Sequence, residues 1–436
     1  YLTVAVRNIL RHKVYSCINI MGLAVGMACC ILILLWVQDE MSYDRFHENA
    51  DDIYRVIQNI NFTDHSTTWA ITQGPLGPSL KEDFPEIINA TRMRQEDFLT
   101  LTYNDKTFDE TGFMVDGSIF EMFSFSLIKG DSATALSDPH SIVLSKELAE
   151  KYFGEEDSLG KTITLNHKYD FEVTGVLEDI PQNSSIKPNL LIPFIFGREV
   201  GWTVDRWNNS FIQTFVQLKD DIPYQDVVQK ISEYLHNKPT IEKDSRLNLQ
   251  PLKKIHLYSN YDFDKAHGDI TSVIIFFFVA VFILLIACIN YMNLATARSA
   301  NRAREVGMRK VVGAFKADII RQFLGESILL SVLALFFAVL LVELLLPIFN
   351  DIAEKELSLN IIGSLKIIGV LLSISLFVGI LSGSYPAIFL SAFQPVRILR
   401  GPLQLGTRGS FFRKILIAVQ FSLTIILLIS TAIAYQ

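Results

Sequence analysis

The stretch Val14–Val37, VYSCINIMGLAVGMACCILILLWV, is 24 residues long without a charged side chain, and Val273–Ala297 is another such run of 25 residues. A helix rises about 1.5 Å per residue, so about 20 apolar residues cross a hydrocarbon core of roughly 30 Å. Three further apolar runs follow, at Ile319–Phe349, Ile361–Leu390 and Ile415–Tyr435. The sequence therefore predicts a membrane α-helical protein with five transmembrane helices.

Charge is divided unevenly between two parts of the chain. From Asp39 to Ile270 there are 22 Lys/Arg and 39 Asp/Glu, a net charge of −17. The remaining residues carry 17 Lys/Arg and 7 Asp/Glu, a net charge of +10, mostly in short segments between the apolar runs. Short basic loops are typical of the cytoplasmic side of a membrane. We predict a cytoplasmic N-terminus and one large domain on the opposite side.

The acidic block has the pattern of a mixed α/β domain. Tyr54–Phe62 and Thr162–Val176 alternate in polarity and predict strands, the second interrupted by a turn. Lys146–Phe153 and Tyr224–His236 have helical periodicity, and Arg246–Leu257 is predicted as a further strand. None of the four cysteines lies in this block, so the domain has to fold on its apolar core alone. We predict an inserted α+β extracytoplasmic domain.

The predicted organisation has four parts. Residues 1–38 form an interfacial helix and the first span, and residues 39–271 form the external domain. Residues 272–390 hold the second to fourth spans, with a short cytoplasmic helix at about 299–314. Residues 391–436 hold a cytoplasmic loop and the fifth span. We expect this last part to begin a second copy of the unit, continuing beyond Gln436.

Motifs of catalysis and metal binding are not found in the sequence. Gly154–Thr162 has two glycines followed by Lys-Thr, but five residues separate the glycines where a phosphate loop has four, and three of the five are acidic. We interpret it as a turn that leads into a strand. The eight histidines show no metal-ligand spacing. We therefore expect no catalytic residue, no metal and no nucleic-acid partner.

The loop between the second and third runs carries the most specific pattern. It reads NRAREVGMRKVVGAFK over residues 301–316. Glu305 and Arg309 stand at i and i+4, which supports a helix. Gly313 and Ala314 provide a helix stop before the next span. The pattern predicts a short helix along the cytoplasmic face that docks a partner.

This loop also carries a resemblance to a known family. Arg304–Ala314 resembles the cytoplasmic coupling segment of MacB/FtsX-like ABC transporter permeases. Gln38–Glu48 resembles the start of the family's external domain, and Tyr152–Thr162 with Val173–Val176 resembles its middle. Ser384–Ala387 resembles the family's fourth helix. The similarity covers nearly the whole chain in the family's order of helix, large domain and three helices.

The resemblance implies a type VII permease in the bacterial inner membrane that works by mechanotransmission in export or efflux. A separate cytoplasmic ABC ATPase would bind ATP and Mg, so this chain would hold no cofactor and would not be an enzyme. The other implied partners are a second permease half, in the same longer chain or as a dimer, a periplasmic adaptor and the lipid bilayer. A lipoprotein-releasing permease and an FtsX-like regulator of cell-wall hydrolases remain alternatives. The residues to which the resemblance assigns ATPase coupling are Arg304, Glu305, Val306, Gly307, Arg309, Lys310, Gly313 and Ala314.

Several residues within the spans have a predicted packing role. Gly22 and Gly26 permit a close helix–helix contact, including one between copies. Pro386 is expected to kink the fourth span. Glu326 and Glu343 are the acidic exceptions in the third, and we interpret both as snorkelling to a membrane edge. A charge at mid-membrane would cost about 2.5–3.5 kcal/mol on insertion scales, so Glu326 is the residue to test.

Overall fold

A computed structural model of the chain describes residues 7, 11, 13–62, 64–202, 204–239, 244–265, 268–297, 306–359, 364–391 and 407–434. The chain divides into two compact units. One consists of Tyr1–Asp39 with Thr271–Gln436, and the other is Glu40–Ile270. The first is called the membrane unit below, and the second the external unit.

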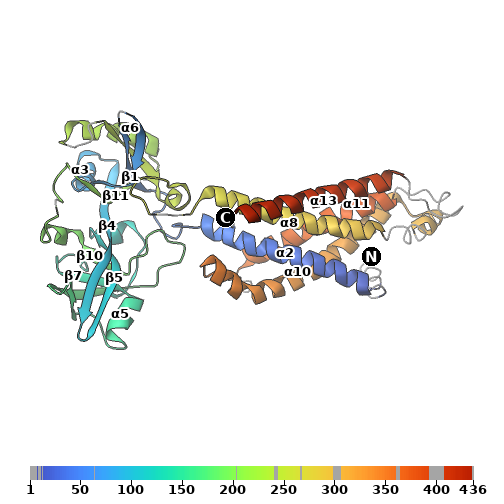
Figure 1. The fold of residues 1–436 in the computed structure, drawn as a ribbon, viewed down its shortest axis with the longest axis horizontal. Coiled ribbons are helices and arrows are strands. Elements are labelled where there is room, and N and C mark those ends of the chain that lie inside the picture. The colour runs from blue at the N-terminus through green and yellow to red at the C-terminus, as the bar shows by residue number, and fades with distance from the viewer. Residues whose placement is uncertain are drawn as a thin grey trace. The chain divides into compact units, whose positions relative to one another are not determined.

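Long helices make up the described part of the membrane unit. They are α2 (Lys13–Met41), α8 (Ile270–Ala297), α10 (Lys316–Ala353), α11 (Leu365–Ser391) and α13 (Thr407–Ala434). The first four are long and apolar enough to cross a membrane. Figure 1 shows these four helices running alongside one another.

The prediction of five spans is wrong by one among the described residues. Four helices qualify as spans, and in α13 the apolar stretch among the residues described with their side chains, Lys414–Ile429, is shorter than these four. Polar side chains at Gln420, Ser422 and Thr424 lie within this stretch.

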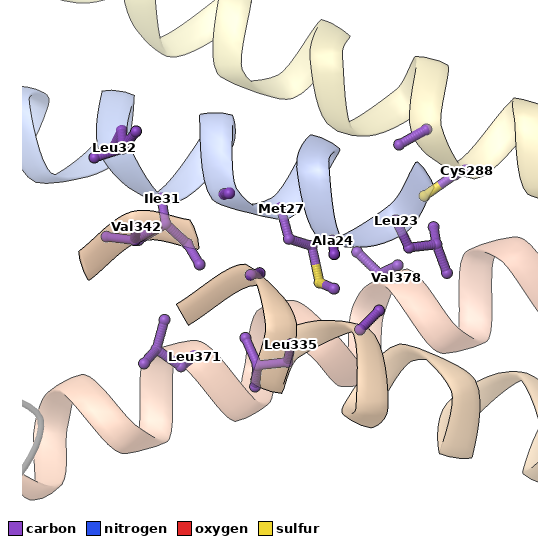
Figure 2. Close-up of a cluster of buried hydrophobic side chains, with 14 of the residues drawn as sticks. Leu23, Ala24, Met27, Ile31, Leu32, Cys288, Leu335, Val342, Leu371 and Val378 are labelled. Carbon is purple, nitrogen blue, oxygen red and sulfur yellow. The ribbon is translucent and has the colours of Figure 1, made fainter. Parts of the chain in front are cut away.

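The core of the membrane unit lies between α2, α10 and α11. Leu23, Met27 and Ile31 of α2 are buried in one cluster with Leu335 of α10 and Val378 of α11. Figure 2 shows Met27 and Ile31 pointing from α2 toward α10 and α11. Dispersion contacts of this kind, rather than exclusion from water, hold membrane helices together.

The external unit is built on one mixed sheet. Its strands are β1 (Ile53–Asn61), β2 (Ser66–Trp69), β3 (Thr72–Gln73), β4 (Ile87–Tyr103), β5 (Lys106–Val115), β6 (Leu127–Gly130), β7 (Ser141–Ser145), β8 (Thr162–Leu165), β9 (Tyr169–Leu177), β10 (Leu190–Pro193), β11 (Ser210–Leu218) and β12 (Ser245–Pro251). The main order is β12-β1-β11-β4-β5-β10-β7-β9-β6. Most pairs are antiparallel, whereas β10 with β5 and β7 with β9 are parallel.

Short helices cover the sheet and complete the α+β class. Apolar side chains of α3 (Leu76–Asp83) and α6 (Tyr224–Ile231) pack in a cluster with β1, β11 and β12. Those of α5 (Lys146–Phe153) pack against β4, β7, β8 and β9. Figure 1 shows α5 beside the long β4–β5 hairpin. A small helix, α4 (Ile119–Met122), belongs to a third cluster.

Element ends differ from the sequence prediction at two places. The strand predicted over Arg246–Leu257 ends at Pro251, and a 3₁₀ turn and α7 (Ile255–Tyr258) follow. Proline has no N–H to donate to the next strand, which favours an end there. The helix predicted over Tyr224–His236 continues past α6 only as the 3₁₀ segment Tyr234–Asn237.

Candidate functional site

The short helix predicted between the second and third spans is present in the described residues. Residues 306–311 are helical. The chain then turns at Gly313, whose φ of +101° favours glycine. The N–H of Ala314 donates to the carbonyl of Arg309 at 3.0 Å, which closes the helix end. The predicted stop is confirmed, whereas Arg304 and Glu305 lie outside the described residues. Residues 306–315 are called the coupling segment below.

One apolar side chain anchors this segment to the membrane helices. Val306 is buried in a cluster with Ile319 and Phe323 of α10 and with Ala387 and Leu390 of α11. Gly307, the next residue, is buried as well. The helix therefore rests on the first turns of α10 and on the last turns of α11.

The basic residues of the segment bind these same two helices. Arg309 donates through Nη1 to Oε1 of Gln322 in α10. Lys310 donates through Nζ to the carbonyl oxygen of Ser391 at 2.6 Å, at the C-terminal end of α11. A cation is stabilising there because the last carbonyls carry partial negative charge. Two residues predicted to couple an ATPase thus make contacts that position the segment itself.

Apolar side chains, not the cations, form the exposed face of the segment. Met308 is 60% exposed, Val311 63%, Val312 88% and Phe315 78%. These four residues are called the inner apolar surface. Beside them lies an open hollow of about 340 Å³ lined by Met308, Arg309, Val312 and Ala314. Exposed apolar side chains gathered on a short connecting segment are available for contact with a partner or with lipid.

Glu326 is buried inside the helical bundle. Its exposed fraction is 8%, and it lines a small cavity with Tyr15 of α2 and Tyr291 of α8. Tyr291 Oη and Ser327 Oγ lie 3.0 Å apart at the same cavity. The snorkelling interpretation is therefore wrong for Glu326, because its helix face points to neighbouring spans. Glu343, by contrast, is exposed.

The predicted close contact of the first span is made within the chain. A Cβ added at Gly26 would lie 2.5 Å from Cβ of Ala287 in α8. One added at Gly22 would lie 3.5 Å from Nδ2 of Asn290, in the same helix. Since two Cβ atoms cannot approach to 2.5 Å, Gly26 is needed for the present spacing of α2 and α8.

A second close contact, between α10 and α11, was not anticipated from the sequence. A Cβ at Gly379 would lie 2.8 Å from Cα of Ile328, and one at Gly383 would lie 2.6 Å from Oγ of Ser327. The hydroxyl of Ser331 donates to the carbonyl of Ser375 at 2.8 Å. Small residues are common in membrane helices, so only the structure shows which of them face a neighbour. Pro386 lies inside α11 and is buried.

The phosphate-loop-like stretch in the external unit is a turn. Gly154 and Gly160 have φ values of +65° and +71°. Lys161 donates to a carboxylate oxygen of Glu156, within the stretch itself. The chain then enters β8, as the turn interpretation predicted.

Comparisons with known proteins agree with this architecture. The model of the MacB-like periplasmic core domain matches residues 16–234, and that of the FtsX-like permease C-terminal domain matches residues 277–395. An apolar helical bundle with a large domain inserted after its first helix is the architecture to which these two matches correspond. The chain belongs to the MacB/FtsX-like ABC transporter permease family.

Individual relatives differ in how much of their length the chain matches. The chain is 28% identical over 272 residues to the macrolide export ATP-binding/permease protein MacB of Bdellovibrio bacteriovorus, covering 59% of this chain and 38% of that protein. It is 23% identical to the uncharacterized ABC transporter permease YvrN of Bacillus subtilis, covering 92% and 99%. The periplasmic region of MacB from Actinobacillus actinomycetemcomitans is similar at 18% identity and a TM-score of 0.34, covering 46% and 89%.

Proposed function

We propose that this chain is the permease subunit of an ABC exporter that works by mechanotransmission. A separate cytoplasmic ATPase binds ATP and Mg, and its movement is passed through the membrane helices to the external unit. The observation that carries the proposal is the inner apolar surface, exposed on a segment whose own cations are bonded to α10 and α11. Support also comes from the family and from relatives named for macrolide export.

The geometry fits a segment that receives force rather than one that performs chemistry. Val306 seats the coupling segment on both helices, while Arg309 and Lys310 hold one helix each. A partner that covers Val312 and Phe315 would remove apolar area from water, which favours association. The close contacts at Gly379 and Gly383 then make α10 and α11 move as a pair.

The remaining parts of the proposal concern the assembly. The N-terminus and the coupling segment lie in the cytoplasm, and the external unit lies in the periplasm of a bacterial inner-membrane complex. A second permease half completes the complex, either in a longer chain or as a dimer, and a periplasmic adaptor binds the external unit. Export is favoured over lipoprotein release and hydrolase regulation by the names of the matched relatives.

The test measures ATP hydrolysis by the partner ATPase reconstituted with this permease in lipid nanodiscs. Val312→Glu and Phe315→Glu should each weaken ATPase stimulation about 30-fold or more, since a buried central contact contributes about 2 kcal/mol or more to an interface. Ile128→Glu is the matched control, because Ile128 is 50% exposed but lies in the external unit. Undiminished stimulation in both segment variants would refute the docking role.

A further inference from the structure

The last turn of α2 carries two neighbouring carboxylates with different partners. Oδ2 of Asp39 lies 2.8 Å from Nζ of Lys355. Oε2 of Glu40 lies 2.7 Å from Nε2 of His256. Asp39 and Lys355 belong to the membrane unit, whereas Glu40 and His256 belong to the external unit. Two consecutive residues of one helical turn therefore each bond within their own unit.

The pair on the external side is closely enclosed. The side chains of His256 and Glu40 are 9% and 7% exposed. The ring of Tyr43 stacks on that of His256, with centroids 3.4 Å apart and planes 2° from parallel. A Cβ added at Gly268 would lie 2.6 Å from Nε2 of His256 and 2.7 Å from Oε2 of Glu40. Residues from the start and from the end of the external unit thus meet at one buried bond.

The chain on both sides of this bond is fixed to the sheet domain. After α2, the buried Asp44 accepts hydrogen bonds from the N–H and the hydroxyl of Ser185, at 2.7 and 2.6 Å. Before α8, Asp264 accepts two bonds from the guanidinium of Arg55, at 2.9 and 2.6 Å. Arg55 is itself buried in β1. A displacement at Glu40 or His256 is therefore not absorbed by loose loops.

Lys355, the partner of Asp39 in the membrane unit, is also held in a fixed position by its neighbours. Lys355 follows α10, after Glu354 in a left-handed conformation with φ of +51°. Asn350 folds the next residues back, accepting from the N–H of Leu357 at 3.2 Å and donating to its carbonyl at 2.9 Å. This geometry presents Lys355 to Asp39 in a fixed position, so α2 and α10 are joined at their outer ends.

We infer that Asp39 and Glu40 are the positioning residues through which movement of the spans is delivered to the external unit. The inference rests on the proposed function, and it adds the residues through which movement reaches the external unit. Buried hydrogen-bonded partners transmit displacement because breaking them leaves a group without its partner in a poorly solvated place. The α2 turn acts as a joint between α10 on one side and the outgoing chain before α8 on the other.

The test follows the distance between two spin labels in the full chain bound to its ATPase. The labels replace Asp131 and Asp351, both exposed, in a background without Cys17, Cys29, Cys30 and Cys288. In this parent, ATP should change the distance. Glu40→Ala and His256→Ala should lose that change while ATPase stimulation is retained, because the inner apolar surface is intact. Glu40→Gln, which keeps a hydrogen-bond acceptor, should preserve it, as should the control Glu48→Ala at an exposed carboxylate.

Each other outcome decides against the inference. A parent-like distance change in Glu40→Ala would overturn it. If Glu40→Ala does not fold, Lys355→Met decides, since Lys355 follows the helix and is only partly buried; a normal change there would also overturn it. A parent without ATPase stimulation or distance change would refute the proposed function, and the inference with it.

Discussion

The two ends of the membrane helices are built on opposite principles. At the inner end, polar groups are bonded inward and apolar side chains such as Val312 are exposed. At the outer end, polar pairs such as Glu40 with His256 are buried and close on the same chain. Under the proposed function the inner end is a surface for a partner, and under the further inference the outer end is a joint closed within the chain. Exposed apolar groups can be covered and released repeatedly, and buried polar pairs keep one geometry.

The largest expected effect comes from breaking the connection between the two ends. Gly26→Leu would push α2 away from α8, where Cβ of Ala287 leaves no room. Overpacking of a close contact should cost about 3 kcal/mol or more, so the thermal midpoint of the membrane unit should fall strongly. Gly325→Leu is the matched control, because nothing lies within 4 Å of its added Cβ. Equal midpoints for the two variants would contradict the packing described here.

A second prediction concerns the stability of the external unit at low pH. Burial lowers the pKa of His47 to about 4, and its Nδ1 accepts from the N–H of Ser124 at 3.1 Å. The unfolded chain binds a proton near pH 6.5, while the folded state stays neutral until about pH 4. Stability is thus present above pH 6.5 and is lost as pH falls toward 4, by up to about 3 kcal/mol.

His47→Gln should flatten this dependence of urea unfolding, followed by tryptophan fluorescence between pH 4 and 7. The exposed His236 supplies the control variant His236→Gln, which should keep the full slope. An unchanged slope in His47→Gln would show that another group controls acid unfolding. The loss of stability of the external unit at low pH would then have to be assigned to that other group.

The smallest expected effect tests the inner end alone. Lys310→Met removes the cation at the end of α11 but leaves the inner apolar surface in place. A charge at a helix terminus contributes about 0.3–1 kcal/mol, so ATPase stimulation should fall about two- to fivefold. Lys316→Met, at an exposed position, should leave it unchanged. Complete loss in Lys310→Met would mean that the cation itself contacts the partner.

Length and charge make the two units predictable, because a span needs about 20 apolar residues and the loops carry a strong basic excess. The helix stop at Gly313 is predictable for a local reason, since a positive φ favours glycine. The directions in which the side chains of Arg309 and Lys310 point are not predictable from the sequence, because the positive-inside rule alone already explains basic residues in such a loop. Met308 and Val312 are apolar residues of the kind that usually form a helix core. The sequence therefore gives no sign that their side chains are exposed.

The outer joint could not be found from the sequence for a different reason. Glu40 and His256 are 216 positions apart, and neither belongs to a local pattern. In the sequence Gly268 looks like any loop glycine, and only the structure shows that it lies against His256 and Glu40. The buried position of Glu326 also depends on how the spans pack. The fifth run has the charge-free length of a span in the sequence, whereas the described part of α13 contains a shorter apolar stretch, Lys414–Ile429.

The most direct test places a photocrosslinking amino acid on the coupling segment of the assembled complex. Incorporated at Val312, which is 88% exposed, it should yield a covalent adduct between this chain and the ATPase. Incorporated at Arg309, which bonds to Gln322, it should yield much less, and at Asp131 in the external unit it should yield none. An adduct at Asp131, or its absence at Val312 in an active complex, would contradict the account.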